Sequence, residues 1–343
     1  MGAAVGEEFR DLILGVCDRV LERFNKGRSE GPITMSQAEQ VVSAALPWAR
    51  DYAPDTFEEL VGTADAAGVA PERLVMLNAR NMLSSRGGPA GCTSVMAGAS
   101  ATVSGVGLAG QNWDNDPAMD EFSIVLTRRP SGKPSVTTWG QAGLVGYIGF
   151  NSEGIGVCMN ALNGSSRSEG VPWYFVVRSI YEQSSIDGAA AAVGRARRAI
   201  TANAAMITRE GAADIEATPD EVRVLRHDDR GRLVHTNHCV HPDLVANNDK
   251  YPSSIYGQSF DRKARAERIL NDGAQKTSVD DVKAILSDHD GYPTSICRHP
   301  NDNPSSGWQR SVVSIIVEPD ADRMHVSRGN PCEAPYEVYE AGG

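Results

Sequence analysis

The 343-residue sequence is short of basic residues, with 33 lysines and arginines against 44 aspartates and glutamates and a formal net charge of −11. Nucleic-acid binding needs a concentrated basic surface, so we expect no nucleic-acid partner. No window approaches 18 uninterrupted apolar residues, and the N-terminus lacks the basic and apolar segments of a secretory signal. We therefore expect no membrane partner and a cytoplasmic protein.

Cysteine is also scarce. The six cysteines show no C-x-x-C spacing, which argues against a disulfide framework and for a reducing compartment. His235, His238, Cys239 and His241 form a cluster that raises the question of zinc. Neighbouring residues of a strand point to opposite faces, however, and a second pair of ligands at finger-like spacing is missing. We expect no metal and interpret His235 and His238 as structural groups.

The hydrophobic pattern changes character after about ninety residues. The first part has helical periodicity and predicts helices at 7–25, 36–50, 56–67 and 71–83, with Ser36 as the N-cap of the second. A glycine-rich loop follows, and then short β-rich runs separated by turn residues. We predict strands at 93–98, 105–113, 122–128, 135–139, 145–150, 155–160, 204–209, 214–218, 221–227, 233–237, 312–318 and 323–327, and helices at 172–183, 186–200, 260–271 and 279–287.

This order of elements does not alternate as β-α-β-α. Helices come first, then hairpin-linked strands, helices in the middle and strands again, with a turn at 151–154 joining one hairpin. An α+β sandwich of two mainly antiparallel sheets with helices outside fits this order better than a parallel sheet does.

Cys92 lies where the glycine-rich loop meets a strand. Gly91 tolerates strained backbone angles and would let the chain bend, so that the thiol attacks the preceding carbonyl and forms a thioester that water hydrolyses. Cleavage would give Cys92 a free α-amine with a pKa of about 7.7–8.0, which suits it to accept the thiol proton near neutral pH. On the local string alone, a small buried hydrophobe explains Cys92 equally well.

Six short strings carry a family resemblance that decides between these interpretations. They are GCTS at 91–94, GQNWD at 110–114, GFNSEG at 149–154, NAL at 160–162, HTNHC at 235–239 and YPTSICR at 292–298. Together they resemble the isopenicillin N acyltransferase (acyl-coenzyme A:6-aminopenicillanic acid acyltransferase) family, the C45 peptidase family of N-terminal-nucleophile hydrolases. The motifs occur in family order and cover roughly residues 75–318.

The resemblance implies a four-layer αββα fold and an autoproteolytic enzyme. The chain would cleave between Gly91 and Cys92 into a helical segment, 1–91, and a catalytic segment, 92–343, which stay associated in one structural domain. Cys92 would carry the acyl group as a thioester. Asn237 would donate its side-chain amide to the oxyanion, and Asp114 would orient the nucleophile and assist self-cleavage.

The same resemblance suggests the substrates. Trp113, Phe150 and Arg310 are the candidate substrate-binding residues, although a place in the hydrophobic core is the commoner explanation of a single aromatic residue and a surface salt bridge explains Arg310 equally well. The partners would be a small-molecule acyl donor, with acyl-coenzyme A as a candidate co-substrate, and an amine or water. We expect no permanent cofactor, and a homo-oligomer is a candidate assembly. Asn115 and Asp116 stand where the fungal enzyme has aromatic residues, so the acyl pocket is expected to differ.

Two alternatives remain at this stage. One is an inactive or unprocessed binding protein on the same fold, although Gly91, Cys92, Asp114 and Asn237 are all present. The other is a papain-like cysteine hydrolase, which would need its cysteine at the start of a helix rather than before a strand.

Overall fold

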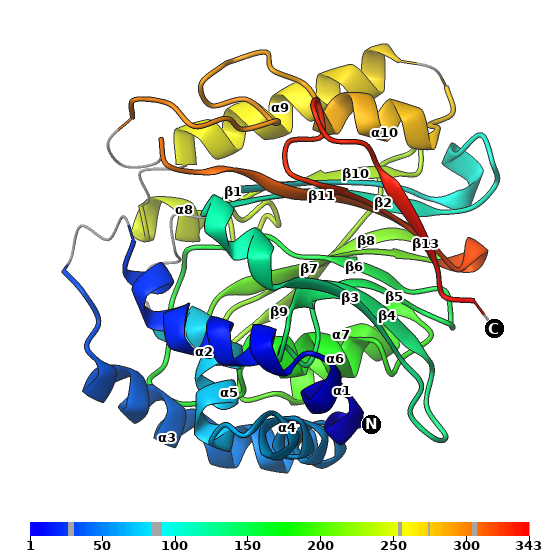
Figure 1. The fold of residues 1–343 in the computed structure, drawn as a ribbon. Helices are drawn as coiled ribbons and strands as arrows, with labels where there is room; N and C mark the ends of the chain where they lie inside the picture. Colours follow the sequence, from blue (N-terminus) through cyan, green and yellow to red (C-terminus); the bar gives the residue numbers. More distant parts are fainter. Residues whose placement is uncertain (27–30, 84–90, 253–255, 274, 304–306, 343) are drawn as a thin grey trace.

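The computed structural model describes residues 1–26, 31–83, 91–252, 256–273, 275–303 and 307–342. Two antiparallel sheets of six and seven strands pack face to face, and helices cover their outer faces (Figure 1). The predicted α+β sandwich with αββα layering is confirmed. No helix in the described ranges combines the length and apolar character that crossing a bilayer requires.

The first sheet carries Gly91, Cys92, Trp113 and Asp114 of the predicted site. Its strand order is β10-β1-β2-β11-β12-β13. The prediction missed its edge strand β13. The bounds are β1 (Gly91–Ala97), β2 (Leu108–Asn115), β10 (Arg232–His235), β11 (Arg310–Glu318), β12 (Arg323–Arg328) and β13 (Glu337–Glu340).

The second sheet is a meander in which each strand pairs with the next along the chain. The predicted hairpin joins β5 to β6, with Gly154 at φ 87° in its turn. Strands β1 and β7 are buried along their whole length, because a sheet in the middle of a sandwich is covered on both faces. The bounds are β3 (Ser123–Arg128), β4 (Val136–Gln141), β5 (Ile148–Asn151), β6 (Gly156–Cys158), β7 (Ala202–Thr208), β8 (Gly211–Ala217) and β9 (Val222–Arg226).

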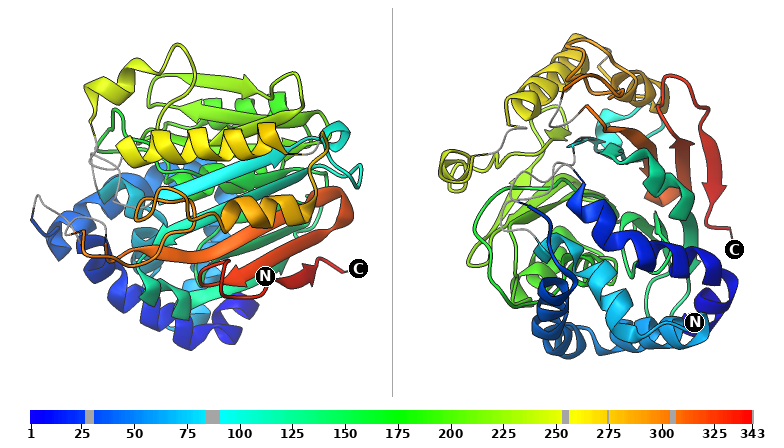
Figure 2. Two further views of the ribbon diagram at one scale, coloured as in Figure 1. Left: turned by 90° about the horizontal axis from the view of Figure 1, so that it is seen from above. Right: turned by 60° about the vertical axis from the view of Figure 1, so that its left-hand side comes forward.

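Helices α9 and α10 lie across the outer face of the first sheet (Figure 2), where they contact β1, β2, β10 and β11. Helices α6 and α7 cover the second sheet, and α7 ends at Arg195 rather than near residue 200. The bounds of the helices are α1 (Gly2–Glu8), α2 (Arg10–Asn25), α3 (Met35–Tyr52), α4 (Pro54–Ala67), α5 (Pro71–Asn78), α6 (Trp173–Ile180), α7 (Ile186–Arg195), α8 (Ala246–Lys250), α9 (Tyr256–Asp272) and α10 (Val279–Leu286).

The start of α3 corrects the predicted N-cap. Thr34, not Ser36, caps the helix: the backbone amide of Gln37 donates to the Thr34 hydroxyl, and the Thr34 amide donates to Gln37 Oε1 at 2.9 Å. This reciprocal pair satisfies two backbone donors that a helix start otherwise leaves without a partner.

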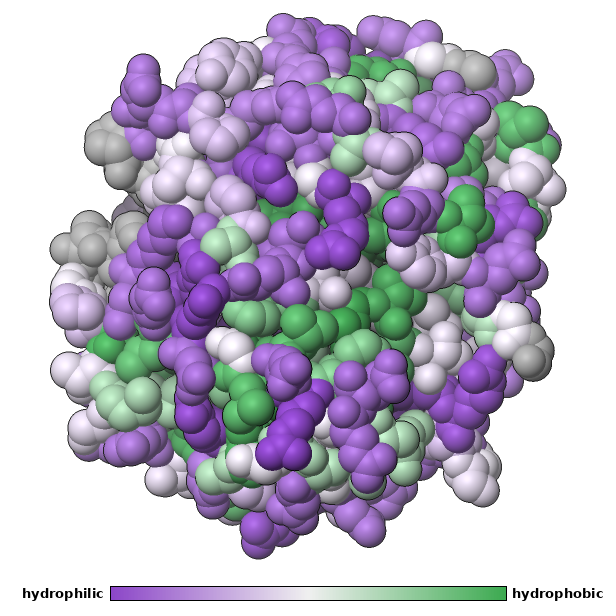
Figure 3. Space-filling view, viewed as in Figure 1, coloured by the Kyte–Doolittle hydropathy of each residue, from purple (hydrophilic) through white to green (hydrophobic). Residues whose placement is uncertain are grey.

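The N-terminal helices share one hydrophobic core with the sheets. Glu59 on α4 reinforces the contact, because its carboxylate accepts hydrogen bonds from Arg128 Nε at 2.7 Å and Arg178 Nη2 at 3.0 Å, all three being buried. Breaking such a buried ion cluster costs about 3–5 kcal/mol. On the face shown in Figure 3, apolar side chains gather in a band across the middle, and the helices above are mainly hydrophilic.

Candidate active site around Cys92

The register of β1 and β2 places the predicted residues side by side. Gly91 lies opposite Asp114, and Cys92 lies opposite Trp113. The predicted strand 105–113 begins and ends later than expected, so that Asp114 belongs to β2. Cys92 is only 3% exposed, but it contributes to the wall of the main pocket. The sandwich therefore brings the proposed nucleophile, the peptide bond predicted to be cut and the predicted carboxylate together.

The space around the Gly91 Cα is tight, whereas its backbone is not strained. It is an ordinary strand residue and is not among the glycines with positive φ. A Cβ built at this position would lie 2.8 Å from Oδ2 of Asp114 and 3.6 Å from the Arg298 guanidinium. The structure itself holds no strained bend at Gly91, and close packing of Asp114 on the backbone gives a further reason for a glycine here.

Asp114 is fully buried between a hydroxyl and a cation. Ser311 Oγ donates to its Oδ1 at 2.7 Å, and Arg298 Nε lies 3.6 Å from its Oδ2. Burial raises the pKa of Asp114 above its ordinary range, while Arg298 and Arg262 act in the opposite direction. A carboxyl with a raised pKa is a better proton acceptor than an ordinary one, provided it is ionised.

Asn237 follows β10 in the chain and contacts the backbone nitrogen of Cys92. The Cys92 amide donates to Asn237 Oδ1 at 2.9 Å, and Asn237 Nδ2 donates to the carbonyl of Ala161 at 3.1 Å. The buried carboxylate of Glu216 holds this segment. It lies 2.9 Å from His235 Nε2 and accepts a hydrogen bond from the amide of Val240 at 2.5 Å. The side chain that was predicted to hold an oxyanion is therefore fixed beside Cys92.

Arg262 on α9 is a site residue that sequence analysis missed. Its guanidinium is buried and donates to the carbonyl of Cys92 at 2.6 Å, to Thr93 Oγ1 at 2.8 Å and to Asn237 Oδ1 at 2.8 Å. Burial and the nearby Arg298 lower the pKa of Arg262 to about 10, which still leaves it charged at neutral pH. No motif pointed to Arg262, whereas Arg298 ends the YPTSICR string and could have been chosen.

The Cys92 thiol is not activated in the uncut chain. Burial, reinforced by the negative charge of Asp114, raises its pKa to about 12, and the positive charge of Arg262 only partly offsets this. Since the thiolate is the nucleophile, the thiol needs a base at neutral pH.

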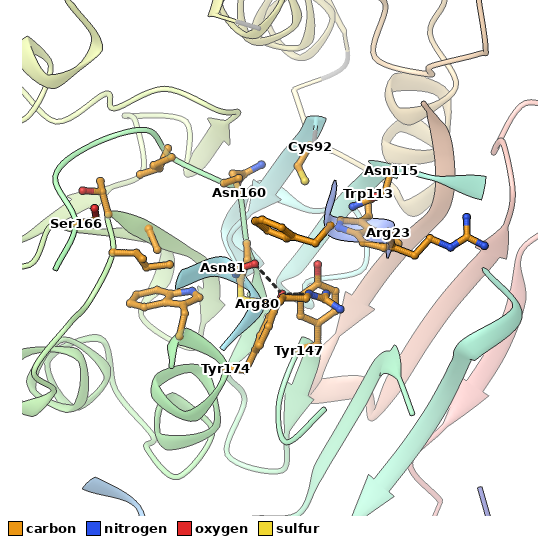
Figure 4. A pocket seen from close by; sticks show the side chains of 18 of the residues that line it. Arg23, Arg80, Asn81, Cys92, Trp113, Asn115, Tyr147, Asn160, Ser166 and Tyr174 are labelled. Carbon is orange, nitrogen blue, oxygen red and sulfur yellow. Dashed lines mark hydrogen bonds between the residues drawn. The ribbon is translucent and has the colours of Figure 1, made fainter. Parts of the chain in front are cut away.

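Asn160 offers an unused donor beside the thiol. Its Oδ1 accepts hydrogen bonds from Ser94 Oγ at 3.0 Å and Asn203 Nδ2 at 3.3 Å. Its Nδ2 is buried and meets no acceptor among the described atoms. Figure 4 shows Asn160 next to Cys92 at one end of the pocket. Like Arg298, it stands in a motif string, NAL, to which no role had been given.

The pocket that Cys92 enters is large and mainly apolar. Its cavity volume is about 160 Å³, against roughly 10–15 Å³ for a cavity that holds a single water. Opposite Cys92, Tyr147 and Tyr174 meet edge to face at 5.2 Å, and Arg80 donates to the Tyr174 hydroxyl at 3.1 Å (Figure 4). An acyl group attached to Cys92 would extend over this aromatic surface.

The three predicted substrate-binding residues separate in the structure. Trp113 lines the pocket and packs edge to face on Trp139 at 5.4 Å. Phe150 is 1% exposed and belongs to the hydrophobic core, whereas Arg310 begins β11 opposite Asn115. Neither residue lines the pocket. The arginines next to the Gly91–Cys92 bond are Arg262 and Arg298, and a substrate-binding role for Arg310 stays a prediction.

The histidine-rich segment 235–241 has structural contacts. His235 is buried against Glu216, with Nε2 to Oε1 at 2.9 Å, and burial lowers the pKa of His238 to about 3 while its Nδ1 lies 2.7 Å from Ser259 Oγ. His235 groups with Asp214 and Glu216 rather than with Cys239. These contacts fix the loop that carries Asn237.

Comparisons with known proteins agree with the motifs. The family model described as acyl-coenzyme A:6-aminopenicillanic acid acyl-transferase matches residues 101–333. The chain is 29% identical over 309 residues to the 40 kDa form of acyl-coenzyme A:6-aminopenicillanic-acid-acyltransferase from Emericella nidulans, covering 87% of this chain and 82% of the relative.

Two solved structures are similar at low sequence identity. Penicillin V acylase from Agrobacterium tumefaciens is 10% identical, with a TM-score of 0.45, and the match covers 72% of this chain and 84% of that one. A mutant of conjugated bile acid hydrolase from Clostridium perfringens is 12% identical, with a TM-score of 0.49, and the match covers 73% of this chain and 96% of that one.

Proposed function

The chain belongs to the acyl-coenzyme A:6-aminopenicillanic acid acyl-transferase family, and we propose that it activates itself by cutting the Gly91–Cys92 bond and then transfers acyl groups through the Cys92 thiol. The observation that carries this proposal is the position of Cys92. Its side chain enters a large pocket, and Asn237 and Arg262 hold the two sides of its backbone.

The cleavage step conserves atoms and charge without a co-reactant other than water. Sγ of Cys92 attacks the carbonyl carbon of Gly91, the C–N bond breaks, and the Cys92 nitrogen takes the proton that the thiol gives up. The Gly91 thioester is then hydrolysed, leaving a carboxylate on Gly91 and a free thiol on Cys92, and the proton released by hydrolysis converts the Cys92 amine to an ammonium. Asp114 packs against Gly91 and suits the role of proton carrier between sulfur and nitrogen.

The acyl-transfer cycle uses the new amine as the base. The amine takes the thiol proton, the thiolate attacks an amide or an acyl thioester, and the leaving amine or thiol is protonated by the Cys92 ammonium. Asn237 and Asn160 are the side-chain amides beside Cys92 that can donate to the tetrahedral oxyanion, the first after releasing Ala161. One such donor typically contributes about 3–4 kcal/mol.

The pocket favours an apolar or aromatic acyl group with a charged carrier. Its floor is formed by rings, whereas Arg23 and Lys26 of the N-terminal segment stand on its wall and share the carboxylate of Asp116. This arrangement suits an acyl donor with an anionic portion, such as acyl-coenzyme A. An amine or water would accept the acyl group, depending on which reaches the thioester.

Segment 1–91 would stay in place after the cut. Its α2 contributes Val20, Arg23 and Phe24 to the pocket, and its α4 is tied to both α6 and β3 by Glu59. Both segments are therefore parts of one active site, which suits a non-covalent pair of fragments.

Intact mass tests the self-cleavage. Wild-type protein is expected as two fragments that co-purify, whereas Cys92→Ala should remain one inactive chain of 36.7 kDa. Cys17→Ala, which changes a buried cysteine on α2 outside the pocket, is the matched control and should be cut. Two fragments separated at this bond in Cys92→Ala would contradict the mechanism.

Activity is tested separately on the processed protein. A matrix of acyl thioesters and amides against amines, with free acid and new amide measured independently, distinguishes a transferase from a hydrolase. An unprocessed binding protein on the same fold would give neither product and a single chain.

A further inference from the structure

Four side chains with metal-binding atoms lie together outside the pocket. His289, Cys297 and His299 belong to the segment between α10 and β11, and Cys332 lies in the turn between β12 and β13. One ligand atom from each lies within 4.8 Å of the other three. We propose that these residues form a tetrahedral site for a structural zinc ion.

Four of the six distances between the ligand atoms lie close to the edges of a zinc-centred tetrahedron, and the two from His289 to the cysteine sulfurs are within 4.8 Å. With Zn–S of about 2.3 Å and Zn–N of about 2.0–2.1 Å, tetrahedral geometry requires about 3.8 Å between sulfurs, about 3.6 Å between S and N and about 3.3 Å between nitrogens. Cys297 Sγ lies 3.6 Å from Cys332 Sγ, and His289 Nε2 lies 3.0 Å from His299 Nε2. His299 Nε2 lies 3.7 Å from Cys297 Sγ and 3.3 Å from Cys332 Sγ.

Hydrogen bonds alone explain this arrangement poorly. Nε2 of His299 has the other three ligand atoms as neighbours, but an N–H can point well at only one of them. A cation at the common centre would use the lone pairs of all four atoms at once. Two thiolates would also neutralise its double charge.

The donor set identifies the class of metal. Two sulfurs and two imidazole nitrogens in a tetrahedron are typical of zinc, and four protein ligands leave no open position for substrate. A structural rather than a catalytic ion is therefore expected.

The surroundings support the four ligands. Asn330 Nδ2 lies 3.5 Å from Cys297 Sγ and also donates to the carbonyl of Arg298 at 2.7 Å. Glu333 Oε1 lies 3.8 Å from His299 Nδ1, which is the place of a carboxylate that orients a metal-bound histidine. Cys297 is buried, but His289 and Cys332 are exposed, so a metal ion can enter from solvent.

Such an ion would stiffen the support of Asp114. Arg298 lies between Cys297 and His299 in the chain. Its side chain is 1% exposed and approaches the Asp114 carboxylate. The ion would tie the Arg298 segment to the turn after β12. It is inferred from the four ligands alone, and does not depend on self-cleavage.

Metal content tests the inference on the full-length protein. After expression with zinc and exhaustive dialysis, elemental analysis should find about one zinc per chain. His289→Ala and Cys332→Ser should each reduce this content at least tenfold. His227→Ala, another exposed histidine outside the cluster, is the control and should retain the metal. Cobalt substitution of the wild type should give the strong visible absorption of a tetrahedral thiolate site.

Three results would overturn the site. The wild type could contain no zinc and take up none from solution, a result that does not depend on the folding of any variant. Both variants could hold as much zinc as the wild type, which would show binding elsewhere. Peptide mapping without reductant could find Cys297 and Cys332 joined to each other as a disulfide.

Discussion

Cys92 and Cys297 are both free, buried cysteines, and burial raises the pKa of each thiol to about 12. Their neighbours differ. Around Cys92 lie an amide, an arginine and a carboxylate that hold a peptide bond at the wall of a pocket, whereas Cys297 faces two histidines and a second cysteine. Burial alone leaves either thiol inert, so each needs a partner that lowers its pKa: the two proposals assign this role to a new amine at Cys92 and to a cation at Cys297.

The largest expected effect is on the pH dependence of Cys92 reactivity. In the uncut chain the raised pKa keeps the thiol protonated, so its thiolate fraction should grow about tenfold per pH unit, or about 1000-fold from pH 7 to 10. After cleavage, the adjacent ammonium favours the thiolate, and the rate should level off near the pKa of the amine. Iodoacetamide labelling of Cys92, followed by peptide mass, measures both rates.

Asn237→Leu supplies the uncut sample for this experiment. It removes one of the two proposed oxyanion donors and the hydrogen bond to the Cys92 amide, while Asp114 and Arg262, which shift the Cys92 pKa, remain. An equally steep rise in the cleaved wild type would show that the new amine does not activate the thiol.

Arg262→Met should slow self-cleavage about 100-fold. The change removes charge-assisted hydrogen bonds to the Cys92 carbonyl and to Asn237, and such bonds contribute about 1.5–3 kcal/mol each. Arg268→Met, on an exposed position of the same helix, is the matched control. The fraction of cut chain against time after refolding gives the rate, and equal rates for both variants would remove Arg262 from the site.

Asn330→Ala sharpens the other half of the comparison. Loss of the amide beside Cys297 should weaken zinc binding about 10–100-fold, the usual effect of removing a group that supports a metal ligand. Competition with a chelator measures the affinity, with Asn271→Ala as the control, an asparagine outside the four-ligand cluster that accepts hydrogen bonds from Arg230. Unchanged affinity would argue against a metal-bound Cys297.

The layers and most strands could be predicted because buried β-rich runs and helical periodicity are local. Strand β13 could not, since Glu337–Glu340 is an edge strand with mostly exposed side chains. Cys92, Asp114 and Asn237 lie near one another as the motifs implied.

The arginines of the site needed the structure. Arg262 looks like one of many charges on the polar face of a helix, and its burial depends on how α9 packs across β1. Arg310 was chosen as a substrate-binding residue, but Arg298 is the arginine whose side chain reaches Asp114. The candidate zinc ligands escaped notice because Cys332 comes from a turn far along the chain.

Gly91→Ala should have the smallest effect and is the most local test of the Cys92 site. The added methyl would lie 2.8 Å from Asp114 Oδ2, so the carboxylate must move, and overpacking of this kind costs about 1–3 kcal/mol. We expect self-cleavage about tenfold slower, with zinc content unchanged. Gly194→Ala on α7 is the control, because its methyl meets nothing within 4 Å and alanine favours a helix. Cleavage of Gly91→Ala at the wild-type rate would mean that the close contact between Asp114 and the scissile peptide does not assist the reaction.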